Sequence, residues 1–85
     1  MSAALQWARG VACGGVAEKA VLMLLALRAG DGSGCVVSRA DLAREGELSR
    51  RAVERALVTL EGRGLIFRAA RAETVEITLK REDGR

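Results

Sequence analysis

The side chains best suited to bind a charged ligand are six arginines that lie together within Ser49–Arg71. Only two glutamates share that stretch, so it carries a net charge of +4, against +3 for the whole 85-residue chain. Guanidinium groups bind phosphates and guanine edges through paired N–H donors. A basic patch confined to one segment is typical of proteins that bind a nucleic-acid backbone. The patch alone is a weak indication, because arginine also favours any solvated helix face.

Residues for catalysis or metal binding are sparse. The chain has no histidine, the commonest general base, and it lacks paired carboxylates and a glycine-rich phosphate loop. Its two cysteines, Cys13 and Cys35, lie 22 residues apart, which does not match the spacing of zinc sites. We therefore expect two reduced thiols and no enzymatic activity, metal, cofactor or small-molecule ligand.

The longest apolar run, Ala20–Leu27, has eight residues, whereas a helix that spans a bilayer needs about 20. The first residues also lack the basic start and cleavage pattern of a secretory signal. We therefore expect a cytoplasmic protein without a membrane partner.

The periodicity of the apolar residues predicts a single domain that is mainly helical with a small β-hairpin. The expected elements are an N-terminal helix and linker (1–15), a first core helix (16–29), a glycine-rich turn (30–34), a short strand (35–37), two capped helices (38–64) and a hairpin (65–80). The N-terminal helix is expected over Ser2–Arg9, and residues 81–85 as a frayed tail. The first core helix is apolar almost all round, so we expect other helices to cover it on several sides.

Two capped helix starts follow one another closely. Ser38 and Ser49 each precede a short run of helical periodicity, and each hydroxyl can accept from an amide of the first turn. The first of these helices is expected to stop at Gly46, and the second at Gly64 with a left-handed cap. Two short helices joined by three residues are a candidate helix-turn-helix.

The second of these helices divides into two faces. Val53, Leu57 and Leu60 fall on one side and would anchor it to the core. The opposite side carries Arg51, Arg55 and Val58, with Glu54 and Thr59 beside them. Arg50 lies at the N-terminus, where the helix dipole favours a phosphate. The arginines of the first turns could bind guanine in the major groove.

After residue 64 the apolar residues change from a helical period to a period of two, which predicts a hairpin with strands Leu65–Arg68 and Thr74–Lys80. Its tip has no Gly or Asn, which leaves the turn geometry open. Arg68 and Arg71 would lie near the tip, where they could contact flanking phosphates; otherwise they are edge-strand charges that discourage aggregation.

Residues 42–57 read LAREGELSRRAVERAL and residues 60–66 read LEGRGLI. This pattern resembles winged helix-turn-helix regulators and replication proteins of bacteria, phages and plasmids, in which a Leu-Ser-x-x-x-Val turn and recognition helix run into Leu-x-x-x-Gly-Leu-Ile and a wing. The resemblance extends from about residue 4 to residue 80, and its length and overall character are similar to small plasmid repressors of the KorC type. The departures are Ala52, where such helices often carry Thr, and the glycine-free tip.

The resemblance implies a winged helix-turn-helix with an extra N-terminal helix, and recognition-helix contacts at Ser49, Arg50, Arg51, Arg55 and Thr59. Glu54 could accept from a cytosine amino group or exclude wrong bases, and its neighbour one turn on, Val58, offers it no charged partner. Two interpretations of Arg39 stay open: it contacts a phosphate, or it lies on a solvated helix face. The full set of candidate DNA-contacting residues is Ser38, Arg39, Ser49, Arg50, Arg51, Glu54, Arg55, Thr59, Arg68 and Arg71.

These expectations favour sequence-specific binding of double-stranded DNA by a transcriptional repressor. One winged helix reads few base pairs, so we expect a homodimer on a palindromic operator. Trp7 either completes the core of its own domain or carries the N-terminal helix onto a second subunit. The alternatives are a replication-initiation or accessory protein of a plasmid or phage, and a winged helix that binds only protein.

Overall fold

The computed structural model describes residues 2–30 and 32–81, and within them it contains four helices and one three-stranded antiparallel sheet. Their bounds are α1 Ala3–Gly10, α2 Val16–Ala29, β1 Gly34–Ser38, α3 Arg39–Gly46, α4 Arg50–Gly62, β2 Ile66–Ala70 and β3 Thr74–Leu79. The fold is thus α+β and mostly helical. Asp31 of the expected turn and residues 82–85 of the expected tail lie outside the described residues.

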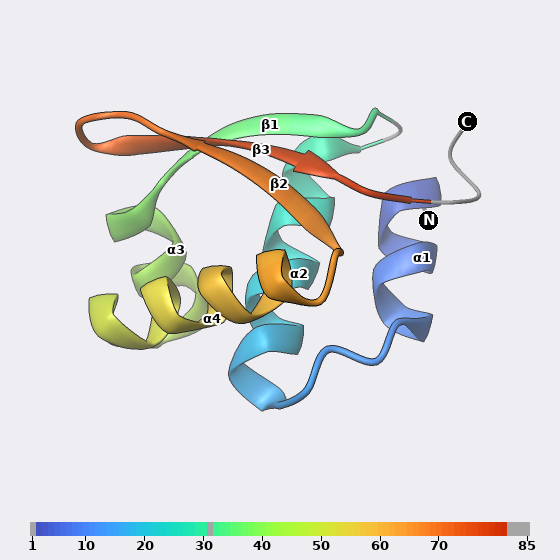
Figure 1. The fold of residues 1–85 in the computed structure, drawn as a ribbon, viewed down its shortest axis with the longest axis horizontal. Helices are drawn as coiled ribbons and strands as arrows, with labels where there is room; N and C mark the ends of the chain where they lie inside the picture. Colours follow the sequence, from blue (N-terminus) through green and yellow to red (C-terminus); the bar gives the residue numbers. More distant parts are fainter. Residues whose placement is uncertain (1, 31, 82–85) are drawn as a thin grey trace.

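The sheet has the order β1-β3-β2 and lies across one side of α2, α3 and α4 (Figure 1). The register pairs Val37 with Val75 and Ile66 with Leu79. Alternate residues of β3 are buried, as the period of two requires, so one face of the sheet packs on the helices and the other is exposed. The first hairpin strand was expected to end at Arg68, but β2 runs as far as Ala70, which shortens the tip.

The hairpin tip closes on Ala72 and Glu73. The backbone N–H of Arg71 donates to the Thr74 carbonyl oxygen at 3.0 Å. Neither residue of the tip has a positive φ angle, so the turn forms without the glycine that mirror-image hairpin turns need. This answers the question that the glycine-free tip left open in the sequence.

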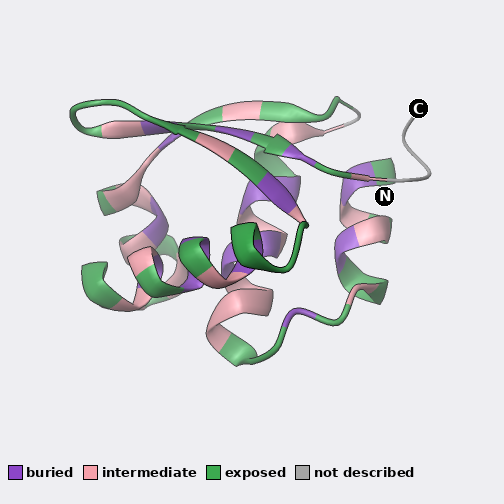
Figure 2. Ribbon diagram, viewed as in Figure 1, coloured by how far each residue is buried: buried purple, intermediate pink, exposed green. Residues whose placement is uncertain are grey.

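Helix α2 occupies the expected range and is the centre of the molecule. It packs against α1, α3, α4 and β1, and its residues Val21, Leu22, Leu25 and Ala26 are completely buried. Exposed residues gather on the outer sides of the other elements and on the hairpin (Figure 2). In residues 2–30 and 32–81, no helix combines the length and the apolar character needed to cross a bilayer.

Helix α1 is attached to α2 by a lysine as well as by apolar contacts. Ala4 and Ala8 are buried against the core, and Trp7 is half-buried on it, which agrees with the first of the two interpretations of Trp7. Lys19 Nζ donates to the carbonyl oxygens of Ala8, Arg9 and Val11 at 2.8, 3.0 and 2.7 Å. Carbonyls at the end of a helix lack partners within it, so the ammonium group caps the C-terminus of α1.

We expect Lys19→Met to lower the free energy of unfolding by about 1 kcal/mol, because the change removes a charged cap but keeps the apolar stem. Urea unfolding followed by circular dichroism measures the loss. Arg51→Met is the matched control, since Arg51 is exposed and forms no ion pair within residues 2–30 and 32–81. Equal stability of the two variants would contradict the capping role.

Helix α3 ends at Gly46, the glycine at which the sequence predicts its end. Helix α3 includes Gly46, and the left-handed conformation falls on Glu47, with φ 54°. A Cβ at Gly46 would lie 3.3 Å from Leu48 Cδ1 and 3.4 Å from Leu24 Cδ1. Gly46 has no positive φ angle, so its backbone freedom is not used, and the left-handed conformation at Glu47 costs about 1 kcal/mol.

Candidate nucleic-acid interface

Both expected serine caps are present. Ser38 Oγ accepts from the Asp41 amide at 3.2 Å, and Ser49 Oγ accepts from the Ala52 amide at 3.0 Å. Each cap satisfies an amide that the helix leaves without a partner. At the other end of α4, Gly64 takes a positive φ of 77° and the Leu65 amide donates to the Leu60 carbonyl at 3.0 Å, as expected for a left-handed cap.

Helix α4 has the two faces that its sequence predicts. Val53, Leu57 and Leu60 are completely buried, together with Ala56. The outward face carries three exposed arginines and one exposed valine: Arg50, Arg51, Arg55 and Val58. The burial of one side therefore fixes the orientation of the other, and the arginines project away from the core.

The outward arginines are not neutralised. Among residues 2–30 and 32–81, no acidic side chain forms an ion pair with Arg50, Arg51 or Arg55. By contrast, Arg44 binds Asp41 at 2.6 Å. Unpaired guanidinium groups on an exposed face retain all their donors for an external anion or a base edge.

A second group of charges lies between α4 and the sheet. Glu54 Oε2 accepts from Arg68 Nη1 at 2.7 Å, and Glu54 Oε1 accepts from Arg39 Nε at 3.2 Å. Arg68 Nε also donates to Glu61 at 2.9 Å, and Arg39 Nη1 donates to the Thr74 carbonyl at 3.4 Å. We call Arg39, Glu54, Glu61 and Arg68 the Glu54 cluster. It joins α3, α4, β2 and the start of β3.

The hydrogen bonds within the Glu54 cluster shift the pKa values of Glu54 and Arg68. The hydrogen bond from Arg68, aided by that from Arg39, holds the pKa of Glu54 below its ordinary value of 4.5, although partial burial opposes the shift. The same contact with Glu54 raises the pKa of Arg68. Glu54 and Arg68 are therefore both charged at neutral pH, and their charges offset each other.

One expectation about these residues is wrong. Arg68 does not lie near the hairpin tip: it sits within β2, opposite Ile77, and its side chain is only 19% exposed. The reason is that β2 continues to Ala70, and the alternation of the strand turns Arg68 to the same face as the buried Ile66. Glu54 gains no partner from Val58, as expected, but it has two arginine partners on other elements. The Glu54 side chain reaches across to other elements instead of along its own helix.

The remaining candidates lie in three different environments. Arg71 does lie at the tip, where its side chain is 60% exposed and binds Glu76 at 3.1 Å. Arg39 is 18% exposed, so it is neither on a solvated face nor free for an external phosphate. Thr59 is half-buried at the side of α4 that faces α2.

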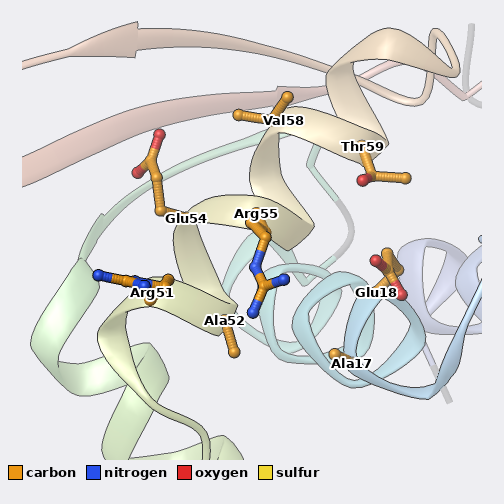
Figure 3. Close-up of a pocket in the computed structure, with 8 residues that line it drawn as sticks. All are labelled: Ala17, Glu18, Arg51, Ala52, Glu54, Arg55, Val58 and Thr59. Atoms are coloured by element: carbon orange, nitrogen blue, oxygen red, sulfur yellow. The ribbon is translucent and has the colours of Figure 1, made fainter.

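A shallow groove of about 550 Å³ runs beside the outward face of α4. Its lining residues are Ala17, Glu18, Arg51, Ala52, Glu54, Arg55, Val58 and Thr59. Figure 3 shows Arg55 extending from α4 into the space beside α2, whereas Glu54 points away from α2 toward the strands. Ala17 and Glu18 were not expected at the site, because only the packing of α2 on α4 brings them there.

The cysteines are free thiols in the interior, as expected. Cys13 is buried and Cys35 half-buried, and burial raises the pKa of both. Neither is therefore activated as a thiolate at neutral pH.

No family model, curated protein or solved structure matches the chain.

Proposed function

We propose that this chain is a winged helix-turn-helix protein that binds double-stranded DNA in a sequence-specific manner, with α4 in the major groove. The observation that carries the proposal is the outward face of α4. It presents Arg50, Arg51 and Arg55, which have no acidic partner among the described residues, on a helix that is anchored by its opposite side. An α-helix fits the major groove, and arginine bound to guanine is the commonest specific contact there.

The order and arrangement of the elements support this proposal. The sequence α2-β1-α3-α4-β2-β3 places a hairpin directly after two helices that are joined by a short turn. In Figure 1 the hairpin tip and the first turn of α4 lie toward the same end of the longest axis. A duplex that receives α4 would then meet Arg71 at the tip, where a flanking phosphate could displace Glu76.

The candidate residues take different roles in this proposal. Arg51 and Arg55 read bases, and Arg50, at the N-terminus of α4, binds a phosphate. Ser38 and Ser49 fix the starts of α3 and α4. Arg39, Glu54 and Arg68 hold the hairpin against the helices rather than contact DNA. The electrostatic attraction therefore comes from the arginines that the Glu54 cluster leaves unpaired.

We further propose that the protein is a repressor that binds a palindromic operator as a homodimer. One copy of α4 covers only a few base pairs, and two copies related by a two-fold axis double the length read. The apolar side of α1 already packs on α2, which leaves Gln6 and Arg9 among its exposed residues. A dimer formed through α1 would therefore use a largely polar surface.

A second candidate function is binding to another protein. The groove beside α4 favours it, because Ala17, Ala52 and Val58 offer apolar surface to an incoming side chain. The unpaired arginines favour DNA, since an apolar docking helix would bury their charges at a cost. The salt dependence of binding distinguishes the two.

Selection of duplexes from a random DNA pool, followed by mobility-shift titrations at increasing salt, tests the proposal. We expect a selected palindrome that binds two chains. Four phosphate contacts, from Arg50 and Arg71 of each copy, predict a slope of about −3.6 for log K against log salt. Failure to enrich any duplex, or binding that does not weaken with salt, would contradict DNA binding and favour the protein-binding module.

A further inference from the structure

One apolar side chain stands among the unpaired arginines of α4. Val58 is 51% exposed, and it lines the groove beside Ala52. Positions 51, 55 and 58 follow the spacing i, i+4, i+7, so Arg51, Arg55 and Val58 share one face of the helix. Figure 3 shows the Val58 side chain pointing away from α2, with no other labelled side chain across it.

The major groove offers one base that suits such a side chain. Thymine alone carries a C5-methyl group, and apolar side chains recognise it by contact. We propose that Val58 is a specificity-determining residue that packs its methyl groups on a thymine methyl, next to a guanine bound by Arg55 or Arg51. This inference rests on the proposed function, because it requires α4 to enter the major groove.

The spacing along α4 limits where this thymine lies in the half-site. Arg55 and Val58 are three residues apart, or about 4.5 Å along the helix axis, which is close to one base-pair step. Arg51 and Val58 are seven residues apart, about 10 Å, or roughly three steps. The thymine is therefore expected beside the guanine that Arg55 reads, and about three steps from the one that Arg51 reads.

The acidic residues near the groove do not offer a better partner for another base. Glu54 could accept from a cytosine amino group, but both its oxygens are already engaged by Arg68 and Arg39. Glu18 lies on α2, not on the outward face of α4 (Figure 3). The outward face therefore presents guanidinium donors and an apolar side chain but no free carboxylate, a combination that matches guanine and thymine.

Replacing thymine by uracil tests this inference, because it removes only the C5-methyl group. Each thymine of the palindrome selected by the full chain is replaced in turn, and binding is measured for the wild type, Val58→Ala and Val36→Ala. Val36 is the matched control, since it is 59% exposed but lies on the outer face of the sheet. We expect one position per half-site at which uracil weakens wild-type binding roughly fourfold, the value of one buried methyl group.

At that same position, Val58→Ala is expected to bind the thymine and uracil duplexes equally, and Val36→Ala to retain the fourfold difference. Val58 is exposed, so the change to alanine should leave the fold intact, which circular dichroism checks. Wild type and Val58→Ala that respond alike at every thymine would overturn the role of Val58 while leaving DNA binding in place. If no duplex can be selected, the proposed function and this inference fall together.

Discussion

The double substitution Arg51→Ala and Arg55→Ala is expected to weaken binding to the selected operator by at least about thirtyfold. Each arginine placed to bind a guanine edge contributes about 1–3 kcal/mol of discrimination, and the two together remove charge from the centre of the proposed interface. Neither side chain has an ion-pair partner in the parts of the chain that the structure describes, so their loss should leave the fold unchanged. Mobility shifts measure affinity, and urea unfolding checks stability.

Comparing the loss of affinity for the operator with the loss for unrelated DNA shows whether these arginines read bases. Binding to unrelated DNA should fall much less than binding to the operator, because base contacts specify whereas phosphate contacts position. Lys80→Ala with Arg63→Ala is the matched control, since it removes two exposed positive charges that also form no ion pair within residues 2–30 and 32–81, but leaves the outward face of α4 intact. An equal loss in the control and the test variant would show that only net charge matters, and would reject α4 as the base-reading helix.

Local features of the fold could be predicted from the sequence because their causes are local. Ser38 and Ser49 cap helices through amides three residues away, and Gly64 ends α4 through its own backbone. The face of α4 that carries Arg51 and Arg55 follows from its helical period alone. The order of residues along the chain is therefore enough to identify the candidate base-reading side chains.

The features that sequence reasoning missed depend on contacts between distant residues. Arg68 and Glu54 are 14 positions apart, and Arg39 and Thr74 are 35 apart, so no periodic pattern connects them. The extra length of β2, which carries Arg68 away from the tip, is set by its register on β3. Likewise, the left-handed conformation of Glu47 has no glycine or asparagine to announce it in the sequence.

Glu54→Ala is expected to lower the free energy of unfolding by about 2 kcal/mol at neutral pH, while it raises affinity for unrelated DNA several-fold. Stability falls because Arg39 and Arg68, 18% and 19% exposed, lose their shared carboxylate. The loss is held below that of a buried pair because Glu54 is itself 45% exposed and solvent screens it. Affinity rises because a negative charge leaves the interface and Arg39 loses its carboxylate partner, while Arg68 keeps only its bond to Glu61.

The dependence of this destabilisation on pH identifies its cause. The pKa of Glu54 is lower in the folded protein than its ordinary 4.5, so the carboxylate stabilises the fold above that value and stops doing so as pH falls through the lower, folded pKa. The stability difference between wild type and Glu54→Ala should therefore be full at pH 6–7 and shrink below about pH 4.5. Glu45, whose pKa Arg28 also lowers, is present in both proteins, so its contribution cancels in the difference.

Two further variants separate charge from shape. Glu54→Gln keeps the size of the side chain and one acceptor oxygen, so it should lose about half as much stability as Glu54→Ala and show the same rise in nonspecific affinity. Glu73→Gln removes an exposed carboxylate at the hairpin tip, outside the Glu54 cluster, and should leave the free energy of unfolding at neutral pH unchanged. A stability loss in Glu54→Ala that persists unchanged at pH 3 would assign it to packing. A fall in nonspecific affinity would instead make Glu54 a DNA contact, because a residue that only restrains two arginines must release them when it is removed.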